Sequence, residues 1–466
     1  MPPLLEAGFA RHREAFARQP FPDAPRRIER LSRLEALVRE NADAWAEAIS
    51  RDFGNRSRHE TQLLELFPSL EAIRHARRHV RRWMRPERRP TNFWFLPGSS
   101  QVLPQPLGVV GIVVPWNYPL YLAIGPLVPA LAAGNHAMVK MSETTPATGD
   151  LLATLAARYF EEGELTVVNG GPEVAQAFCR LPFDHLLFTG STGIGRHVMR
   201  SAAENLTPVT LELGGKSPAI VGRGYSVEEA AGRILYGKCL NAGQTCIAPD
   251  YALVPEGSVG PFVEAAKRTV ASLYPTLAGN PDYTSIVDER HRRRLDRLLL
   301  DATQKGATAI EVNPAGEDVA AAGKRAPTLL VDVDDSMAVM REEIFGPLLP
   351  VIAYGSLEEA IDFVNARPRP LALYVFETRR DAVDQVIRNT VSGGVTVNET
   401  ILHIAQDDLP FGGVGDSGMG QYHGREGFDA FSKRKAVFRQ SGLNGLKLFR
   451  PPYGGRFEKL ARLLMR

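Results

Sequence analysis

The sequence predicts an α/β protein built from more than one domain. From residue 107 onward, short apolar runs typical of buried strands alternate with segments of helical length. This alternation indicates a parallel sheet with helices on both faces. A chain of 466 residues exceeds the size that one core usually supports, so we expect two or three domains. An apolar content of 44% and a charged content of 23% are those of an ordinary soluble globular protein.

The N-terminal region is predicted to be helical. Residues 26–85 are rich in Arg and Glu, with Leu, Ile, Val and Trp at helical spacing. Residues 74–89 are densely basic and fit either a nucleic-acid patch or a solvated helix face. The balance of 55 basic and 53 acidic residues favours the solvated face, so we expect no nucleic-acid partner. Residues 91–106 hold several prolines and are interpreted as a linker or an edge hairpin.

The first alternating region runs from residue 107 to residue 214. Helix 119–133 would begin at a proline and end before Gly134, both in their preferred places. Nucleotides bind sheets of this kind at the carboxyl ends of the strands. The predicted strands are 107–115, 136–141, 165–170, 184–190 and 208–214, and the helices that separate them are 119–133, 146–162, 172–180 and 191–204.

After Gly215 the pattern repeats more loosely, which predicts a second α/β domain. The tail after Gly442 is expected to form at most a short amphipathic helix. We expect strands near 217–222, 250–254, 328–332, 350–354, 371–376 and 394–397, and helices near 227–240, 258–273, 287–304, 356–366 and 379–389.

Cysteine usage and the chain's N-terminus indicate a cytoplasmic protein. Cys179, Cys239 and Cys246 form no C-x-x-C pair, so we expect neither disulfides nor a cysteine zinc site. His75 and His79 have the i, i+4 spacing of zinc ligands, but they lack an H-E-x-x-H pattern and lie among arginines; no metal is expected. No secretory signal and no apolar run long enough to span a membrane is visible.

The stretch from Leu211 to Pro249 carries the strongest chemical signal. It begins LELGGKSP and ends GQTCIAP, and it contains Glu212 and Cys246. A thiolate attacks electrophilic carbon, and a carboxylate can take a proton from water. The alternative for Cys246 is a buried core cysteine, because free cysteine is among the most buried residue types.

Glycine-rich segments suggest where phosphate could bind. FTGSTGIG, residues 188–195, ends a strand and opens a helix whose N-terminal amides could bind phosphate, although its glycine order departs from G-x-G-x-x-G. A formal G-x-G-x-x-G does occur at Gly413, Gly415 and Gly418. It follows no clear strand, and we interpret it as a loop.

Three further motifs place polar side chains at strand ends. In VKMSE, Lys140 and Glu143 could bind the two hydroxyls of a ribose, or form a surface salt bridge. In PWNYP, Asn117 could donate to a developing oxyanion, or cap a turn. In EEIFGP, Glu343 and Phe345 would face the same side of an extended segment.

Together these motifs resemble the aldehyde dehydrogenase family over about residues 20–440. PWNYP, KMSE, FTGSTGIG, LELGGKSP, GQTCIAP, EEIFGP, GGVTVN and PFGGVGDSGMG occur in the family's order, which is highly specific. GQTCIAPDY is similar to class 3, the class of fatty and aromatic aldehyde dehydrogenases. HIAQDDLPFGGVG and KCLNAGQTC resemble the bacterial coniferyl aldehyde dehydrogenases. One departure is Met141, where many relatives have proline.

The resemblance implies a role for each motif residue. Cys246 would be the nucleophile and Glu212 the general base, and Asn117 would form the oxyanion hole with the Cys246 amide. The residues implied in cofactor binding are Trp116, Lys140, Glu143, Gly190, Ser191, Gly195, Glu343 and Phe345. The implied reaction is the oxidation of an aromatic aldehyde such as coniferyl aldehyde, or of a medium or long aliphatic aldehyde, to the acid. NAD is the expected cofactor, with NADP possible.

The resemblance also implies a domain plan and a homodimer. Residues 1–90 and 107–210 would form a Rossmann-like NAD-binding domain, and residues 211–401 the catalytic domain. Residues 91–106 and 402–440 would form an oligomerisation sheet, and 441–466 a tail. The rival hypotheses are an acylating, coenzyme A-dependent dehydrogenase on the same fold, and a nucleic-acid or scaffold protein that uses the arginine-rich helix.

Overall fold

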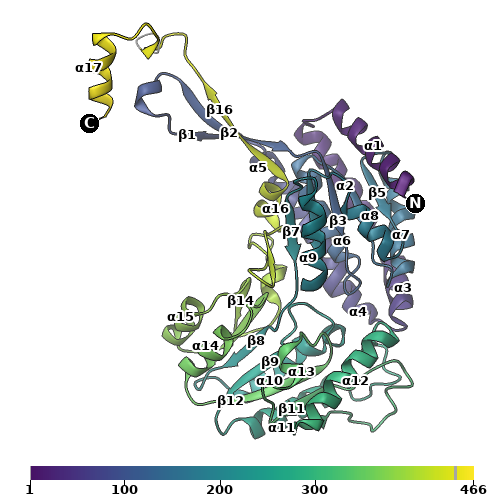
Figure 1. The fold of residues 1–466 in the computed structure, drawn as a ribbon. Helices are drawn as coiled ribbons and strands as arrows, with labels where there is room; N and C mark the ends of the chain where they lie inside the picture. The colour runs from purple at the N-terminus through teal and green to yellow at the C-terminus, as the bar shows by residue number, and fades with distance from the viewer. Residues whose placement is uncertain (1, 446–448, 466) are drawn as a thin grey trace.

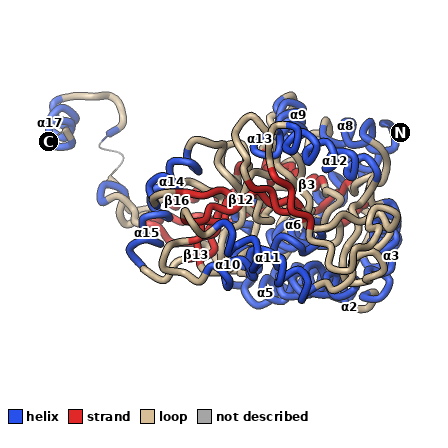
Figure 2. Tube along the Cα trace, turned by 90° about the horizontal axis from the view of Figure 1, so that it is seen from below, coloured by secondary structure: helices blue, strands red, loops and turns tan. Residues whose placement is uncertain are grey.

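The computed structural model describes residues 2–445 and 449–465 and contains three sheets. Strands occupy the middle of the body and helices surround them (Figure 2). The predicted α/β class is confirmed. Within the described ranges, no helix combines the length and the apolar character needed to cross a membrane.

The first sheet has the order β15-β7-β6-β3-β4-β5 and is parallel except for β15. Its central strands β3, β4 and β6 are fully buried. The strands are β3 Val109–Val113, β4 His136–Lys140, β5 Leu165–Val168, β6 His185–Thr189, β7 Val209–Glu212 and β15 Gly418–Met419. The helices that flank it are α6 Tyr121–Ala133, α7 Pro146–Tyr159, α8 Pro172–Cys179 and α9 Thr192–Ala203.

The N-terminal helices pack around this sheet (Figure 1). The predicted helical region is divided by short turns and one π-helical segment, and an additional helix, α1, precedes it. The elements are α1 Pro2–Arg18, α2 Ala24–Arg39, α3 Ala42–Phe53, α4 Arg58–Thr61, η1 Gln62–Leu66 and α5 Phe67–Trp83. The basic stretch on α5 does form ion pairs with acids, because Arg74 and Arg77 both bind Glu35 of α2.

The second sheet has the order β10-β11-β12-β9-β8-β13-β14, in which only β10 is antiparallel. Its strands are β8 Pro218–Val221, β9 Tyr251–Pro255, β10 Thr308–Glu311, β11 Thr328–Val331, β12 Leu348–Tyr354, β13 Ala372–Phe376 and β14 Gly394–Val397. Its helices are α10 Val227–Cys239, η3 Leu240–Gly243, α11 Val259–Leu273, α12 Glu289–Gln304, α13 Ala338–Arg341, α14 Leu357–Asn365 and α15 Arg380–Asn389.

The third sheet projects from the body together with the C-terminal helix (Figure 1). It joins residues far apart in sequence, because β2 pairs with β1 on one side and with β16 on the other. A hairpin is present as expected, but its first strand, β1, lies before residue 91, and residues 90–98 connect it to β2. The projecting elements are β1 Glu87–Arg89, η2 Phe93–Phe95, β2 Ser99–Pro106, β16 Ser432–Arg439 and α17 Gly455–Leu464. Two short helices that precede β16 pack on the body instead: η4 Leu402–Ala405 against β14, and α16 Gly424–Ala430 against α6.

The sequence interpretation was wrong at one glycine-rich segment. Gly418 does not lie in an unpaired loop: with Met419 it forms β15, which pairs antiparallel with Leu211 and Glu212 of β7. The amide of Leu213 also donates to the Ser417 carbonyl at 3.0 Å. A Cβ at Gly418 would collide with the Leu211 carbonyl, so this strand requires the absence of a side chain.

Candidate active site

A cavity of about 460 Å³ lies where the carboxyl ends of β3, β6 and β7 face the loops of the second sheet. It gathers segments that are more than two hundred residues apart in sequence. Eight of the predicted site residues line it: Trp116, Asn117, Gly190, Ser191, Glu212, Cys246, Glu343 and Phe345.

Cys246 lies just after the 3-10 turn η3 and is partly exposed to the cavity. The turn is strained, because Asn241 and Ala242 both have φ of 51° without being glycine. The Gln244 side chain holds the turn in place: its Nε2 donates to the carbonyls of Asn241 and Ser285 at 2.9 and 3.0 Å. The backbone that leads to the thiol is therefore rigidly held.

Glu212 is the last residue of β7 and is 2% exposed. Neither of its carboxyl oxygens has a hydrogen-bond partner, and burial raises the pKa of the carboxyl well above its usual value. Burial also raises the pKa of the Cys246 thiol, and the carboxylates of Glu343 and Glu212 raise it further. Burial thus disfavours the charged form of both groups.

Asn117 follows β3 and is 3% exposed. Its Nδ2 donates to the Gln244 carbonyl at 3.1 Å. The backbone carbonyl of Asn117 accepts hydrogen bonds from Arg56 Nη1 at 3.1 Å and from Asn241 Nδ2 at 3.0 Å. An amide nitrogen carries two hydrogens, so one donor of Asn117 stays available on the side of the cavity.

The turn between β6 and α9 forms another wall of the cavity. The Gly190 amide donates to the Glu212 carbonyl at 3.0 Å, which fixes the turn to β7. Ser191 caps α9 by accepting from the Ile194 amide. A Cβ at Gly193 would meet no atom within 4 Å, so the first turn of the helix is open to a ligand. Such a helix N-terminus suits a phosphate.

Glu343 and Phe345 enter the cavity from the loop before β12. Glu343 Oε1 is buried without a hydrogen-bond partner, and burial raises the pKa of this carboxyl to about 8. Phe345 has φ of 50°, a strained value for a non-glycine residue. The Trp116 ring meets Phe345 edge-to-face at 5.4 Å and His291 at 4.7 Å.

Lys140, Glu143 and Gly195 do not line this cavity. Lys140 is 1% exposed, and its Nζ donates to the carbonyls of Met141 and Gly170 at 2.6 and 2.7 Å. Glu143 is exposed, and its charge raises the pKa of Lys140 against the larger lowering by burial. Gly195 is buried in α9, where a Cβ would lie 2.7 Å from Leu213 Cδ2. These three residues lie near the carboxyl ends of the strands of the first sheet, outside the cavity.

Two cavity residues, His291 and Arg294, escaped the sequence reasoning. Arg294 Nη1 donates to the Ile344 carbonyl at 2.7 Å, and its Nη2 to that of Glu343, so α12 holds the loop that carries Glu343. The helix was expected, but its arginine-rich sequence has no motif that distinguishes a site residue from a solvated one. Among residues 2–445 and 449–465, no group of His, Cys, Asp or Glu could hold a metal ion.

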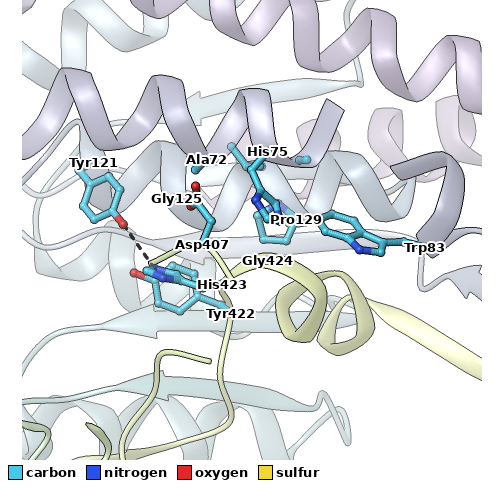
Figure 3. A pocket seen from close by; sticks show the side chains of 12 residues that line it. Ala72, His75, Trp83, Tyr121, Gly125, Pro129, Asp407, Tyr422, His423 and Gly424 are labelled. Carbon is cyan, nitrogen blue, oxygen red and sulfur yellow. Dashed lines mark hydrogen bonds between the residues drawn. The ribbon is translucent and has the colours of Figure 1, made fainter. Parts of the chain in front are cut away.

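A second, much smaller cavity of about 20 Å³ lies between α5, α6 and the loop around residue 423 (Figure 3). Tyr121 and His423 approach each other across it, with the Tyr121 hydroxyl 3.4 Å from His423 Nε2. Its volume suits about one water molecule and excludes an aldehyde. The cavity of about 460 Å³ is the candidate active site, because Cys246, Glu212 and Asn117 all line it.

Comparison of the whole chain with known protein families identifies the family to which it belongs. Residues 6–437 match the model of the aldehyde dehydrogenase family. The chain belongs to the aldehyde dehydrogenase family. As an aldehyde dehydrogenase, it is an oxidoreductase that acts on aldehydes, which confirms the resemblance that the motifs carried.

Individual aldehyde dehydrogenases are similar to this chain over nearly their whole length. The chain is 56% identical over 457 residues to a Pseudomonas aeruginosa protein described as "probable coniferyl aldehyde dehydrogenase", covering 98% of this chain and 95% of that one. The substrate-bound structure of Staphylococcus aureus AldH superposes with a TM-score of 0.92 at 38% identity, covering 98% and 99% of the two chains.

A nicotinamide cofactor is supported by a further structural neighbour. Betaine aldehyde dehydrogenase from Staphylococcus aureus, solved in complex with NAD⁺, has a TM-score of 0.86 at 26% identity, covering 96% of this chain and 89% of its own.

Proposed function

We propose that this aldehyde dehydrogenase oxidises its substrate through a covalent thioester on Cys246 and releases a carboxylic acid. The observation that carries the proposal is that Cys246, Glu212 and Asn117 share one cavity, with a free donor on Asn117 and no partner on the Glu212 carboxyl. A nucleophile, a base and an oxyanion donor are the groups that acyl transfer to water requires.

The first half-reaction forms the thioester. The Cys246 thiol gives its proton to water in the cavity, and the sulfur adds to the aldehyde carbon, which places negative charge on the aldehyde oxygen. The second hydrogen of Asn117 Nδ2 and the Cys246 amide stabilise that charge. A nicotinamide cofactor, when bound, would accept the hydride from this carbon, and the acyl group would then remain on the Cys246 sulfur.

The second half-reaction needs a base. In its ionised form Glu212 takes a proton from a water molecule, the hydroxyl adds to the thioester carbon, and the carbon–sulfur bond breaks to release the acid and the thiolate. The high pKa of Glu212 suits this role, because a base with a raised pKa holds the abstracted proton better than an ordinary carboxylate does.

For the cofactor we propose that Trp116, Gly190, Ser191, Gly195, Glu343 and Phe345 hold the nicotinamide and pyrophosphate end, and that Lys140 and Glu143 hold the adenosine ribose. Glu343 Oε1 would accept from a ribose hydroxyl. NAD is proposed as the preferred cofactor, since the exposed carboxylate of Glu143 would repel a 2′-phosphate.

For the substrate we propose an aromatic aldehyde of the coniferyl type, with medium or long aliphatic aldehydes as further candidates. Support comes from the 56% identity to a relative whose description names coniferyl aldehyde. The three unpaired cysteines suit a reducing compartment, so we propose the cytoplasm as the enzyme's location.

The experiment is a substrate panel with product analysis, run with and without coenzyme A. We expect the highest kcat/KM with coniferyl aldehyde and the free acid as product, with a rate independent of coenzyme A. Formation of an acyl-coenzyme A, with no acid in its absence, would instead establish the acylating reaction. A panel in which aliphatic aldehydes exceed coniferyl aldehyde at least tenfold in kcat/KM would overturn the aromatic assignment alone.

A further inference from the structure

Arg56 is a buried cation at the back of the active site that the mechanism above does not use. Its side chain is 0% exposed, and it lies between α3 and α4. Nη1 donates to the Asn117 carbonyl at 3.1 Å. The guanidinium also lies 3.5 Å from Glu60 Oε2 and 3.7 Å from Glu65 Oε1, two carboxylates that are themselves buried.

Each of these carboxylates holds a different part of the active site. Glu65 Oε2 accepts from the amides of Leu120 and Tyr121 at 2.8 and 3.1 Å, at the start of α6 and three residues after Asn117. Glu60 Oε1 accepts from the Asn241 amide at 3.1 Å, in the strained turn that leads to Cys246. Arg56 is therefore the positively charged partner that the carboxylates of Glu60 and Glu65 share.

The Asn117 peptide lies at the centre of this arrangement. Its carbonyl accepts from Arg56 and from Asn241 Nδ2, while its side-chain amide donates to the Gln244 carbonyl. These three bonds fix both the backbone and the amide plane of Asn117. The remaining hydrogen of Nδ2 is then held in a fixed direction, and Asn117 lines the cavity that holds Cys246.

We infer that Arg56 is a positioning residue for aldehyde oxidation: it aims the Asn117 amide at the oxyanion by holding the Asn117 carbonyl and the two carboxylates that support the neighbouring loops. The inference rests on the oxyanion role proposed for Asn117. Geometry is what makes Arg56 suitable, because a planar guanidinium presents donors in several fixed directions whereas a lysine ammonium is a point charge. A small misplacement of a catalytic donor costs up to about a hundredfold in rate.

The test is a double-mutant cycle on the rate of the NADH burst in stopped flow. The variants are Arg56→Lys, Asn117→Ala and the double variant. We expect Asn117→Ala to slow the burst by about a hundredfold, and Arg56→Lys by about tenfold with the NAD dissociation constant within twofold of the parent. Added to Asn117→Ala, the Arg56→Lys change should slow the burst by less than twofold, because the group through which it acts is already gone.

Arg30→Lys is the matched control. Arg30 is also buried and paired with a carboxylate, Glu164 at 2.8 Å, but it contacts His136 at the far end of β4 and not the active site. Arg30→Lys should lower the melting temperature about as much as Arg56→Lys does, while the rate of the NADH burst stays within twofold of the parent rate. If Arg56→Lys does not fold, the double substitution Arg56→Gln with Glu65→Gln takes its place in the same cycle. This pair removes the charge of the guanidinium and the charge of one of its carboxylate partners together.

Three outcomes are distinguishable. A burst that Asn117→Ala leaves unchanged would remove the oxyanion role, and with it the role of Arg56. A burst slowed by Asn117→Ala but not by Arg56→Lys, or slowed by the two changes multiplicatively, would overturn the role of Arg56 alone. Equal slowing by Arg30→Lys and Arg56→Lys would show that only general stability is involved.

Discussion

Asn117 and Gln244 are joined by a single hydrogen bond between loops of different sheets, from Asn117 Nδ2 to the Gln244 carbonyl at 3.1 Å. Gln244 lies two residues before Cys246, so the oxyanion donor proposed above is tied to the chain that carries the thiol. Relative movement of the two sheets would therefore disturb the donor and the nucleophile together.

Replacement of Cys246 by Ala should abolish aldehyde oxidation and leave NAD binding within about twofold, because the thiol would bond to the substrate and not to the cofactor. Steady-state NADH production and a fluorescence titration with NAD check this. Cys179→Ala is the control, since Cys179 is buried on α8 and does not line the cavity; it should keep most of the activity. Turnover by Cys246→Ala at the parent rate would contradict the mechanism.

Glu212→Gln should separate the two half-reactions. If Glu212 serves the hydrolysis of the thioester, the variant should give a burst of about one NADH per active site and then turn over slowly. Stopped-flow fluorescence measures both phases, with a melting curve to show that the variant is folded. A variant that loses stability and NAD binding, with no selective loss of the slow phase, would point to a purely structural role.

The same residue predicts how the rate depends on pH. Because burial raises the pKa of Glu212, the carboxyl is neutral at low pH and becomes a base only as the pH rises toward that pKa. The hydrolytic phase of the parent should therefore accelerate as the pH rises, over a range displaced upward from that of an ordinary carboxyl group. Glu212→Gln has no proton to lose, so its slow phase should lack this component. Identical pH profiles for the two proteins would exclude Glu212 as the base.

Glu143 should set the preference for NAD. Its carboxylate is exposed, and two of the three donors of the Lys140 ammonium are engaged with backbone carbonyls, so at most one is left for a 2′-phosphate. Glu143→Gln should raise kcat/KM for NADP relative to NAD by about tenfold. Glu173→Gln, on α8, is the control for general loss of negative charge. A parent enzyme that prefers NADP would contradict the assignment of Glu143.

The third sheet should make the enzyme at least a dimer. Strand β16 lies at an edge of this sheet, and seven of its eight residues are at least partly exposed, which favours pairing with another chain. Sedimentation velocity at micromolar concentration should give a dimer, and Ala436→Asp, which puts a charge on that edge, should weaken it. A monomeric parent protein would refute the prediction.

Elements with strong local signals could be predicted from the sequence. The apolar run 107–115 contains β3, and the glycine after residue 133 ends α6 in a left-handed conformation. Strand β10 was missed because it is a short, largely exposed edge strand without an apolar run. Strand β15 was missed because its two residues owe their pairing to β7, which no local pattern encodes.

The residues of the candidate site also divide into those that have a local sequence signal and those that do not. Glu212, Cys246 and Asn117 lie in motifs whose residue types indicate their chemistry. Arg56 lies in no motif, and its importance comes from burial beside two carboxylates contributed by a later turn of helix. Only the folded structure brings those charges together. The domain limits remain predictions, and the experiments above address the roles of the site residues.

The pairing of β15 with β7 also has a consequence for synthesis. Glu212 is followed by two hundred residues before its antiparallel neighbour, Gly418, is made. A nascent chain on the ribosome can assemble the strands β3 to β7 early, but it leaves one side of β7 unpaired until almost the whole polypeptide of 466 residues has emerged. Exposed strand edges invite wrong pairing. The interval between the synthesis of Glu212 and that of Gly418 is therefore the period in which this edge is open to chaperones and to aggregation.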